Sequence, residues 1–521
     1  LVLILLFDAS NNDINQLNIG SQPNIPETSS TSDQTRIEPK QEITKGSRAN
    51  SNKNIEIITD TLKVNISLND GAIVSSELLK YLKYFGSSDE KVKLLNNIKG
   101  SRYTALANIQ SRELDAPTKY TSAKAKYSLG NNNKLTVSIK GRASGLTEVI
   151  KTYTFTRNSH LVEVQQLVKN TSNETIEWRQ YNTLSRGEET EGNGMLYTYT
   201  GAAYFDTEDK FNKIDFSDIE DESFQKVVKT SWISMIQHYF FTAWLPSDKS
   251  SDKKTIYTRL LTDDNKNSYQ IGSVDDYIAL SPGESQSFDS KLYIGPKVQA
   301  EIKDLAPGLA LTVDYGVLTF LAAPLFWILE KIHLVFGNWG WSIIMLTILI
   351  KIVFFKLSES SYKSMAKMKK LTPRMTALKE RYGDDKKQFS EALMKIYKEE
   401  KVNPLGGCLP ILIQIPVFIA LYWVIIESVE MRHAPFIGWI EDLSSADPLY
   451  ILPVLMGISM YAQQKLNPAP TDPMQAKIFL TLPFVFTFLF ATFPSGLVLY
   501  WVTNNILSIA QQYVINKRII T

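Results

Sequence analysis

Apolar and polar residues alternate with a period of two along much of residues 55–300. Leu62, Val64 and Ile66 are each separated by a polar residue, and turn-forming clusters such as 281–283 interrupt the pattern. This alternation is typical of strands that bury one face. Further strand candidates are Leu135–Ile139, Val162–Gln166, Trp232–Leu245 and Ser287–Ile294. Many strands and few helical periods predict a large antiparallel β-sandwich.

After Tyr315, continuous apolar runs replace the alternation. Five of them are predicted to be membrane-spanning helices: Trp339–Leu357, about Leu409–Ile426, Leu449–Tyr461, Ile478–Phe493 and Leu497–Ile515. The run Leu449–Tyr461 gives only about 20 Å of helix at about 1.5 Å per residue. Because a bilayer core is about 30 Å thick, such short spans predict local thinning of the membrane.

The charges between these runs predict their orientation. Basic residues are concentrated in 358–402, and the positive-inside rule places this loop in the cytoplasm. The loop that contains Glu430 and Asp442 is acidic and falls outside, as the β-sandwich should. Only one span can then separate the sandwich from the basic loop. We therefore expect the apolar run Gly316–Leu329, within a segment 301–336, to form an interfacial helix on the outer face.

The beginning of the chain contains little that could form a core. Residues 1–7 are apolar but too few to span a bilayer, and we interpret them as the remnant of an N-terminal transmembrane anchor. A signal peptide is the alternative. Residues 8–54 are rich in Asn, Ser, Thr, Gln and Lys, which predicts a disordered linker.

Composition excludes several classes of function. The 521 residues carry 56 basic and 54 acidic side chains, so nothing suggests nucleic-acid binding. The single cysteine, Cys408, lies in an apolar run and is interpreted as a packed residue; a β-domain without thiols suits a bacterial periplasm. The chain has no Gly-rich phosphate loop, no HExxH and no His pair at metal spacing, and His160 and His238 are interpreted as structural. We predict no cofactor, no metal and no enzymatic activity.

Lys351 lies inside the predicted span Trp339–Leu357, with Thr347 one turn earlier on the same face. A charge at the centre of a spanning helix costs roughly 2.5–3.5 kcal/mol on insertion scales, so such residues are usually functional. Snorkelling of the lysine to the headgroups is an equally supported alternative. The other spans contain further polar residues: Gln414, Gln463, Gln464, Thr503, Asn504, Asn505, Gln511 and Gln512. Each alone suggests an interhelical hydrogen bond, but together with Lys351 they predict a hydrated groove open to the cytoplasm.

The basic loop 358–402 has the pattern of a helical hairpin. Apolar residues recur at helical spacing from Met365 through Met368, and Gly383 with Asp384 and Asp385 supplies a stop followed by a cap. Lys369, Lys370 and Arg374 belong to the basic outer faces. The methionines could form an adaptable peptide-binding surface, although packing within the hairpin is the commoner use.

Several ordered strings between residues 337 and 515 resemble the YidC membrane-protein insertases, relatives of the mitochondrial Oxa and chloroplast Alb proteins. The strings are Gly337-Asn338-Trp339-Gly340-Trp341-Ser342, Ser364-Met365-Ala366-Lys367-Met368, Lys401-Val402-Asn403-Pro404-Leu405-Gly406-Gly407-Cys408, Asp472-Pro473-Met474-Gln475 and Phe493-Pro494-Ser495-Gly496-Leu497-Val498-Leu499-Tyr500. Residues 55–300 resemble the periplasmic domain of the Gram-negative form more loosely, through size, position and strand pattern.

The resemblance implies a core of five transmembrane helices, 337–521, that encloses a groove closed towards the periplasm, and a β-supersandwich in the periplasm. It implies an insertase and chaperone of the inner membrane that catalyses no covalent reaction. Lys351 matches the position of an essential basic residue, usually Arg, and Thr347 matches a substrate-contacting position. The expected substrate groove consists of Lys351, Thr347, Gln414, Trp501, Tyr500 and Asn504, and Trp501 stands where the family often has Tyr.

The expected partner-binding hairpin contains Met365, Met368, Lys369, Lys370, Arg374, Asp384 and Asp385. The resemblance implies nascent membrane proteins, the Sec translocon, the ribosome, the signal recognition particle system and membrane lipids as partners. Two other functions compete with this interpretation. A secondary transporter would show inverted repeats and Gly-interrupted spans, which the sequence lacks. A sugar-processing ectodomain rests on fold analogy alone.

Overall fold

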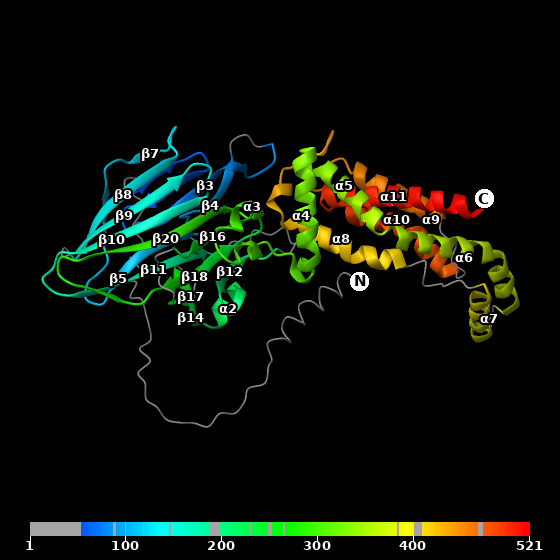
Figure 1. The fold of residues 1–521 in the computed structure, drawn as a ribbon, viewed down its shortest axis with the longest axis horizontal. Helices are drawn as coiled ribbons and strands as arrows, with labels where there is room; N and C mark the ends of the chain where they lie inside the picture. Colours follow the sequence, from blue (N-terminus) through cyan, green and yellow to red (C-terminus); the bar gives the residue numbers. More distant parts are fainter. Residues whose placement is uncertain are drawn as a thin grey trace, which may run out of the picture. The chain divides into compact units, whose positions relative to one another are not determined.

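The computed structural model describes residues 54–520 except 87–89, 99–100, 118, 145–146, 188–197, 230, 248–252, 264–265, 383–384, 401–408 and 467–472 (Figure 1). The predicted anchor remnant 1–7, nearly all of the predicted linker, Asp384 and Cys408 lie outside the described residues. The described part contains a β-rich segment followed by a helical segment, as predicted from the sequence.

The first sheet contains eleven described strands in the order β14-β17-β18-β11-β5-β3-β2-β1-β7, with β19 paired to β11 and β4 to β3. Its strands are β1 (Asn54–Ile58), β2 (Leu62–Ser67), β3 (Ile73–Leu82), β4 (Lys91–Leu95), β5 (Tyr103–Ser111), β7 (Lys126–Ser128), β11 (Ile176–Gly187), β14 (Gln225–Lys229), β17 (Lys253–Asp263), β18 (Lys266–Val274) and β19 (Ile278–Leu280). The pairing is antiparallel except between β1 and β7.

The second sheet contains nine described strands in the order β13-β12-β15-β16-β20-β10-β9-β8-β6. They are β6 (Tyr120–Ser122), β8 (Lys134–Ala143), β9 (Thr147–Thr156), β10 (Leu161–Asn170), β12 (Gly201–Asp206), β13 (Lys210–Ile214), β15 (Trp232–Ile236), β16 (Phe240–Leu245) and β20 (Ser285–Pro296). The short helix α2 (Phe216–Asp221) follows β13. The predicted strand Trp232–Leu245 is therefore a hairpin of two strands, because residues 237–239 form the turn.

The two sheets bury their facing side chains, and this accounts for the period of two in the sequence. Val162 and Val164 of β10 point into the core, while Glu163 between them is exposed. A lysine also lies in this core. The Lys151 Nζ donates to the carbonyl oxygens of Asp70 at 2.6 Å and Ala107 at 2.8 Å, which joins β9 to the opposite sheet. Burial lowers the pKa of Lys151 to about 7.

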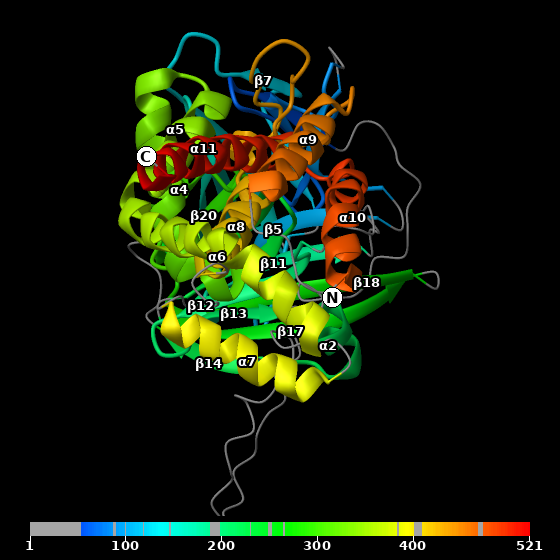
Figure 2. The same ribbon diagram turned by 90° about the vertical axis from the view of Figure 1, so that its right-hand side faces the viewer.

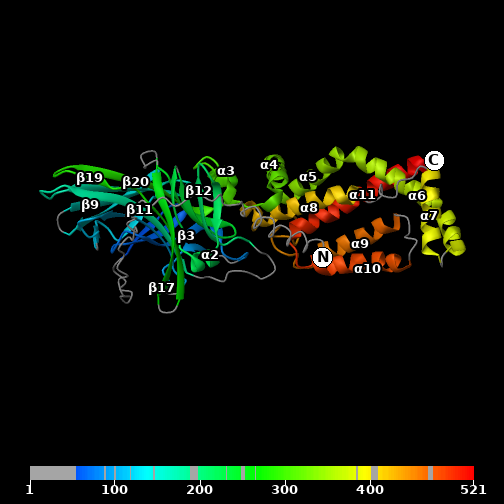
Figure 3. The same cartoon turned by 90° about the horizontal axis from the view of Figure 1, so that it is seen from below.

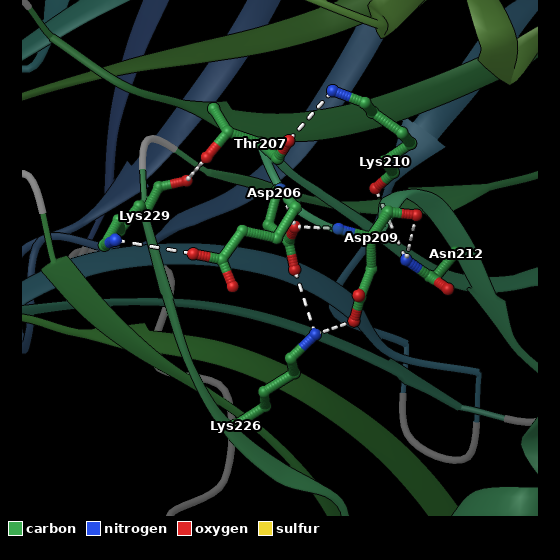
Figure 4. Close-up of polar contacts among 8 residues, drawn as sticks. Asp206, Thr207, Asp209, Lys210, Asn212, Lys226 and Lys229 are labelled. Carbon is green, nitrogen blue, oxygen red and sulfur yellow. Dashed lines mark hydrogen bonds and ion pairs between the residues drawn. The ribbon is translucent and has the colours of Figure 1, made fainter.

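One polar cluster connects the edges of the two sheets. Lys226 of β14 bonds to the carboxylates of Asp206, the last residue of β12, and Asp209, in the turn between β12 and β13 (Figure 4). Asp206 is buried, and its Oδ1 accepts the backbone N–H groups of Glu208 at 2.6 Å and Asp209 at 2.5 Å. Lys229, three residues after Lys226 on the same strand, forms an exposed ion pair of 3.4 Å with Glu208. Lys226 thus holds a turn of one sheet against an edge strand of the other.

The helical part begins after β20. Its helices are α3 (Gln299–Ile302), the 3-10 helices η1 (Leu309–Thr312) and η2 (Gly316–Leu318), α4 (Thr319–Phe336), α5 (Trp339–Val353), α6 (Phe355–Tyr382), α7 (Lys386–Glu399), α8 (Leu409–Glu427), the 3-10 helix η4 (Val429–Met431), α9 (Ile451–Leu466), α10 (Pro473–Phe490) and α11 (Ser495–Ile520). The segment 301–336 is thus not one helix but several short turns followed by α4. In Figures 1 and 3, α4 runs across the direction of α8 and α11.

The boundary between α4 and α5 follows from the local sequence. Gly337 ends α4 with φ of 63°, a left-handed conformation that glycine adopts without steric cost. Asn338 then caps α5, because its side chain accepts the backbone N–H of Trp341 at 3.1 Å. The predicted span Trp339–Leu357 ends early: α5 stops at Val353 and α6 continues at 68° to it. Beyond this bend α6 packs on α11, a tertiary contact that hydropathy does not report.

Buried polar contacts join the β-sandwich to the helices. Lys297, just after β20, forms an ion pair of 3.6 Å with Glu427 at the end of α8, and their side chains are 1% and 3% exposed. His238 contacts the carbonyl oxygen of Ile426 through its Nε2 at 2.9 Å. Burial lowers the pKa of His238 to about 4, so this imidazole is neutral and Nε2 is the donor.

Candidate functional site

Lys351 lies in the last turn of α5 and points into the helical part rather than out of it. Its side chain is 8% exposed, and its Nζ donates to the Ser508 Oγ of α11 at 2.7 Å. Among the described residues, no carboxylate forms an ion pair with this ammonium group. The position near the C-terminal end of α5 is electrostatically favourable for a cation. The structure therefore places a buried lysine amine on a neutral hydroxyl partner.

Ser508 was not among the residues predicted from the sequence. It is 1% exposed, and its hydroxyl donates to the Asn504 carbonyl oxygen at 2.7 Å. The Tyr362 hydroxyl of α6 also forms a hydrogen bond with Ser508. A signal for it was present, because Asn504, Ser508 and Gln512 recur at a spacing of four and form one polar stripe on α11.

Two predicted groove residues meet between α8 and α11. The Asn504 Nδ2 donates to the Gln414 Oε1 at 3.4 Å, a long contact between half-buried amides. The neighbouring Asn505 is buried and donates to the Ser459 Oγ of α9 at 2.9 Å. Polar side chains of α11 therefore contact α5, α8 and α9. Figure 2 shows these helices from the end of the molecule that carries α6 and α7.

Thr347 lies one turn before Lys351 and is 1% exposed. Its hydroxyl donates to the Ile343 carbonyl oxygen of its own helix at 2.7 Å. The Thr347 proton is therefore already used within α5, and only the acceptor capacity of its oxygen remains for a ligand.

Tyr500 and Trp501 belong to an aromatic cluster rather than to the polar stripe. The Trp501 ring meets Phe418 of α8 edge to face at 4.5 Å and Phe490 of α10 at 5.3 Å. Tyr500 is buried and stacks on Phe418 at 6.3 Å. Trp501 is partly exposed, so of these two aromatic residues it is the more accessible to another molecule.

The methionines near the start of α6 pack against α11. Met365 is buried with Tyr362 and Ile515, and Met368 packs against the same cluster. The described partner of Met365 outside its own helix is thus Ile515 of α11. Packing of the methionines within the hairpin stays a prediction. Hydropathy gave no indication of their partner, because the contact depends on the bend after α5.

The basic residues of the hairpin lie on its surface. Lys369, Lys370 and Arg374 are exposed, and Arg374 pairs with Glu400 at 2.5 Å. Asp385 caps α7 by accepting the backbone N–H groups of Lys387 and Gln388, each at 3.0 Å. Asp385 thus has a structural role at the start of α7.

Length and composition single out one described helix as able to cross a membrane, Gly316–Phe336, or two if the bent pair α5 and α6 counts as one span. The described apolar stretches Gln414–Glu427 and Ala476–Phe490 are shorter. No group of three His, Cys, Asp or Glu side chains within the described ranges is arranged to hold a metal ion. The predicted structural residue His160 contacts the Glu301 carboxylate through its Nδ1 at 3.2 Å.

Comparisons with known proteins cover both parts of the chain. Residues 54–328 match the model of the YidC periplasmic domain, and residues 331–521 match that of the 60Kd inner membrane protein. The chain is 47% identical to the membrane protein insertase YidC of Thioalkalivibrio sulfidiphilus (strain HL-EbGR7), over 90% of this chain and 85% of the relative. It is also 47% identical to that of Legionella pneumophila (strain Paris), with the same coverage.

A solved structure titled as an active YidC insertase with its first transmembrane domain resolved aligns over 89% of this chain and 93% of its own, at 18% identity and a TM-score of 0.41. The family assignment rests on the sequence matches, which extend through both the β-rich and the helical part. The chain belongs to the family of YidC membrane protein insertases, in the form that carries a large periplasmic domain.

Proposed function

We propose that this protein inserts nascent membrane proteins into the bacterial inner membrane and assists their folding, alone or together with the Sec translocon. The names of its relatives support insertion as the activity. The observation that carries the proposal is Lys351, a buried positive charge held by a neutral hydroxyl between membrane helices. Such a group costs free energy in a purely structural role, and it is available to a negatively charged client.

The groove would act through charge. A client with a short extracytoplasmic tail must move its acidic residues past the apolar helices. An ammonium group without a carboxylate partner attracts these residues strongly where the dielectric constant is low. Lysine keeps the charge that arginine would supply but lacks its planar set of donors. We therefore propose an electrostatic role for Lys351 rather than a bidentate hydrogen-bonding one, with Gln414 and Asn504 as polar neighbours of the path and Thr347 and Trp501 as contacts.

The proposed orientation places the basic surface of α6 and α7 in the cytoplasm and the acidic loop before α9 in the periplasm. We place α4 in the outer interface, although it is long enough to span. Its residues Ala322, Phe326 and Leu329 pack inwards, whereas Phe320, Trp327 and Leu334 form an exposed apolar stripe. This one-sided pattern, together with the direction of α4 across α8 and α11, favours a helix that lies on the membrane.

The short helices would make the transfer easier. α9 has 16 residues and α10 has 18, which gives about 24 and 27 Å at about 1.5 Å per residue. A bilayer core of about 30 Å would have to thin around them. A nascent chain delivered by the ribosome and the signal recognition particle system would meet the hairpin first. The hydrophobic segment of the client would then leave for the lipid, which supplies the driving force without a nucleotide.

The test is insertion of a client with a short acidic tail into proteoliposomes, measured by protease protection. Wild type is compared with Lys351→Arg, Lys351→Gln and Lys351→Glu. The control is Lys356→Gln, which removes the same charge from an exposed position five residues later. We expect Lys351→Arg and Lys356→Gln to insert like wild type, and Lys351→Gln and Lys351→Glu to fail. Equal insertion by Lys351→Gln would contradict the electrostatic role and leave only membrane thinning.

A further inference from the structure

The hydroxyl of Ser508 connects three helices at one oxygen atom. It accepts a hydrogen bond from the Lys351 Nζ of α5, donates to the Asn504 carbonyl oxygen of α11, and is bonded to the Tyr362 hydroxyl of α6. A serine hydroxyl has one donor and two acceptor sites. Because its proton is used by the Asn504 carbonyl, its oxygen faces Lys351 and Tyr362 as an acceptor.

This geometry suits an ammonium group that must stay in place yet remain available. An ammonium has three donors, and the described contacts of Lys351 use one of them. A carboxylate at the position of Ser508 would neutralise the lysine and compete with any acidic client. An aliphatic side chain there would leave the amine without a fixed partner. A hydroxyl holds the amine and leaves its charge uncompensated.

The lysine has an alternative position that makes such a partner necessary. Lys351 is two residues from the end of α5, and a four-carbon stem from there can carry the amine to water. In the structure Lys351 instead lies against α11 at 8% exposure. The hydrogen bond to Ser508 is the described polar contact that opposes snorkelling.

We propose that Ser508 is a positioning residue that keeps the Lys351 ammonium inside the groove and thereby sets the preference for clients with acidic tails. The inference rests on the proposed insertase function and deepens it. Ser508 itself contacts no client in this proposal and acts only through the lysine. Tyr362 of α6 is a further hydrogen-bonding neighbour of the Ser508 hydroxyl.

The first test measures where the amine is, without any insertion. The full protein in nanodiscs is treated with a water-soluble amine-acylating reagent, and mass spectrometry gives the rate at Lys351 relative to the exposed Lys356. In Ser508→Ala this ratio should rise roughly tenfold, the population change produced by losing a hydrogen bond worth about 1.4 kcal/mol. In Ser508→Thr, which retains a hydroxyl, it should stay near the wild-type ratio.

Ser342→Ala is the matched control. Like Ser508, Ser342 is buried in a helix, here α5, and its hydroxyl donates to the carbonyl oxygen four residues earlier, that of Asn338 at 2.8 Å. Its described hydrogen bond does not involve a lysine. The loss of a buried helical hydroxyl is therefore the same in both variants. An unchanged acylation ratio in Ser508→Ala, or an equal rise in Ser342→Ala, would overturn the proposal.

The second test uses two clients that differ only in the charge of the tail, acidic or with Asp replaced by Asn. Ser508→Ala should lower insertion of the acidic client several-fold and leave insertion of the neutral client unchanged. Ser508→Thr should insert both clients as well as wild type does. An equal loss for both clients would indicate a structural role and overturn the proposal. If wild type inserts and Lys351→Gln fails while Ser508→Ala behaves like wild type, only the positioning role falls. If wild type inserts neither client, the proposed function itself fails.

Discussion

The ion pair between Lys297 and Glu427 offers a sharp test of how the β-sandwich is joined to the helices. Both side chains are almost fully buried, and the pair connects the residue after β20 to the last residue of α8. Burial lowers the pKa of Lys297, and the charge of Glu427 opposes this shift. The substitution Lys297→Met keeps most of the apolar volume of the lysine stem but leaves the Glu427 carboxylate buried without its partner.

Removal of one member of a buried pair typically costs about 3 to 5 kcal/mol, because the remaining charge stays desolvated. On the scale of about 2 to 4 °C per kcal/mol found for domains of 150–250 residues, this predicts a fall in Tm of roughly 6 to 20 °C. The double variant Lys297→Met/Glu427→Leu should recover most of the loss, since a matched apolar pair carries no desolvated charge. An unpaired carboxylate can also take up a proton, so the single variant should be less impaired at pH 5 than at pH 8.

The assay is thermal unfolding of the full protein in one detergent, followed by tryptophan fluorescence. Lys303→Met is the control, because Lys303 is an exposed lysine six residues further on. It should change the Tm by less than about 2 °C, as surface charges contribute little. If Lys297→Met is as stable as Lys303→Met, or if the double variant is no better than the single one, the pair does not hold the two parts together.

Three further variants test other parts of the fold. In a denaturant titration, Lys226→Met should lower the free energy of unfolding by about 1 to 3 kcal/mol, because it leaves the buried Asp206 without its ammonium partner. The control Lys229→Met removes an exposed ion pair on the same strand and should lower it by less than about 0.5 kcal/mol. The pKa of Lys151 is lowered to about 7, so the unfolded chain binds more protons than the folded one above that pH. The contribution of Lys151 to stability should then rise with pH up to the unfolded pKa near 10.5, by roughly 1 kcal/mol per pH unit, and stay flat below pH 7. Lys151→Met should remove this contribution and give a shallower slope than wild type. Gly457→Ala should disturb the contact of α9 with α10, since its Cβ would lie 2.0 Å from the Thr487 Oγ1, and a lower Tm than that of the exposed Ala462→Gly variant is expected.

Local pattern was sufficient to predict the two kinds of structure in this chain. Strands with one buried face impose a period of two, and helices in an apolar environment need continuous apolar residues, so both are visible in the sequence. The end of α4 and the start of α5 were equally local, since Gly337 and Asn338 determine them by backbone conformation and capping. Lys351 could be identified as a candidate site residue for the same reason, because a charged residue inside an apolar run is recognisable from the sequence alone.

The partners of these residues depended on the tertiary structure. Ser508 lies 157 positions from Lys351, and serine is too common in helices to be recognised alone. The methionines of α6 pack on α11 because α6 turns by 68° after α5, and no periodicity encodes that angle. The pairing of Lys297 with Glu427 likewise brings together residues 130 positions apart. The sequence by itself determined which side chains had to be buried or paired, because burial and helix capping act locally, whereas the choice of partner was made by the packing of segments distant along the chain.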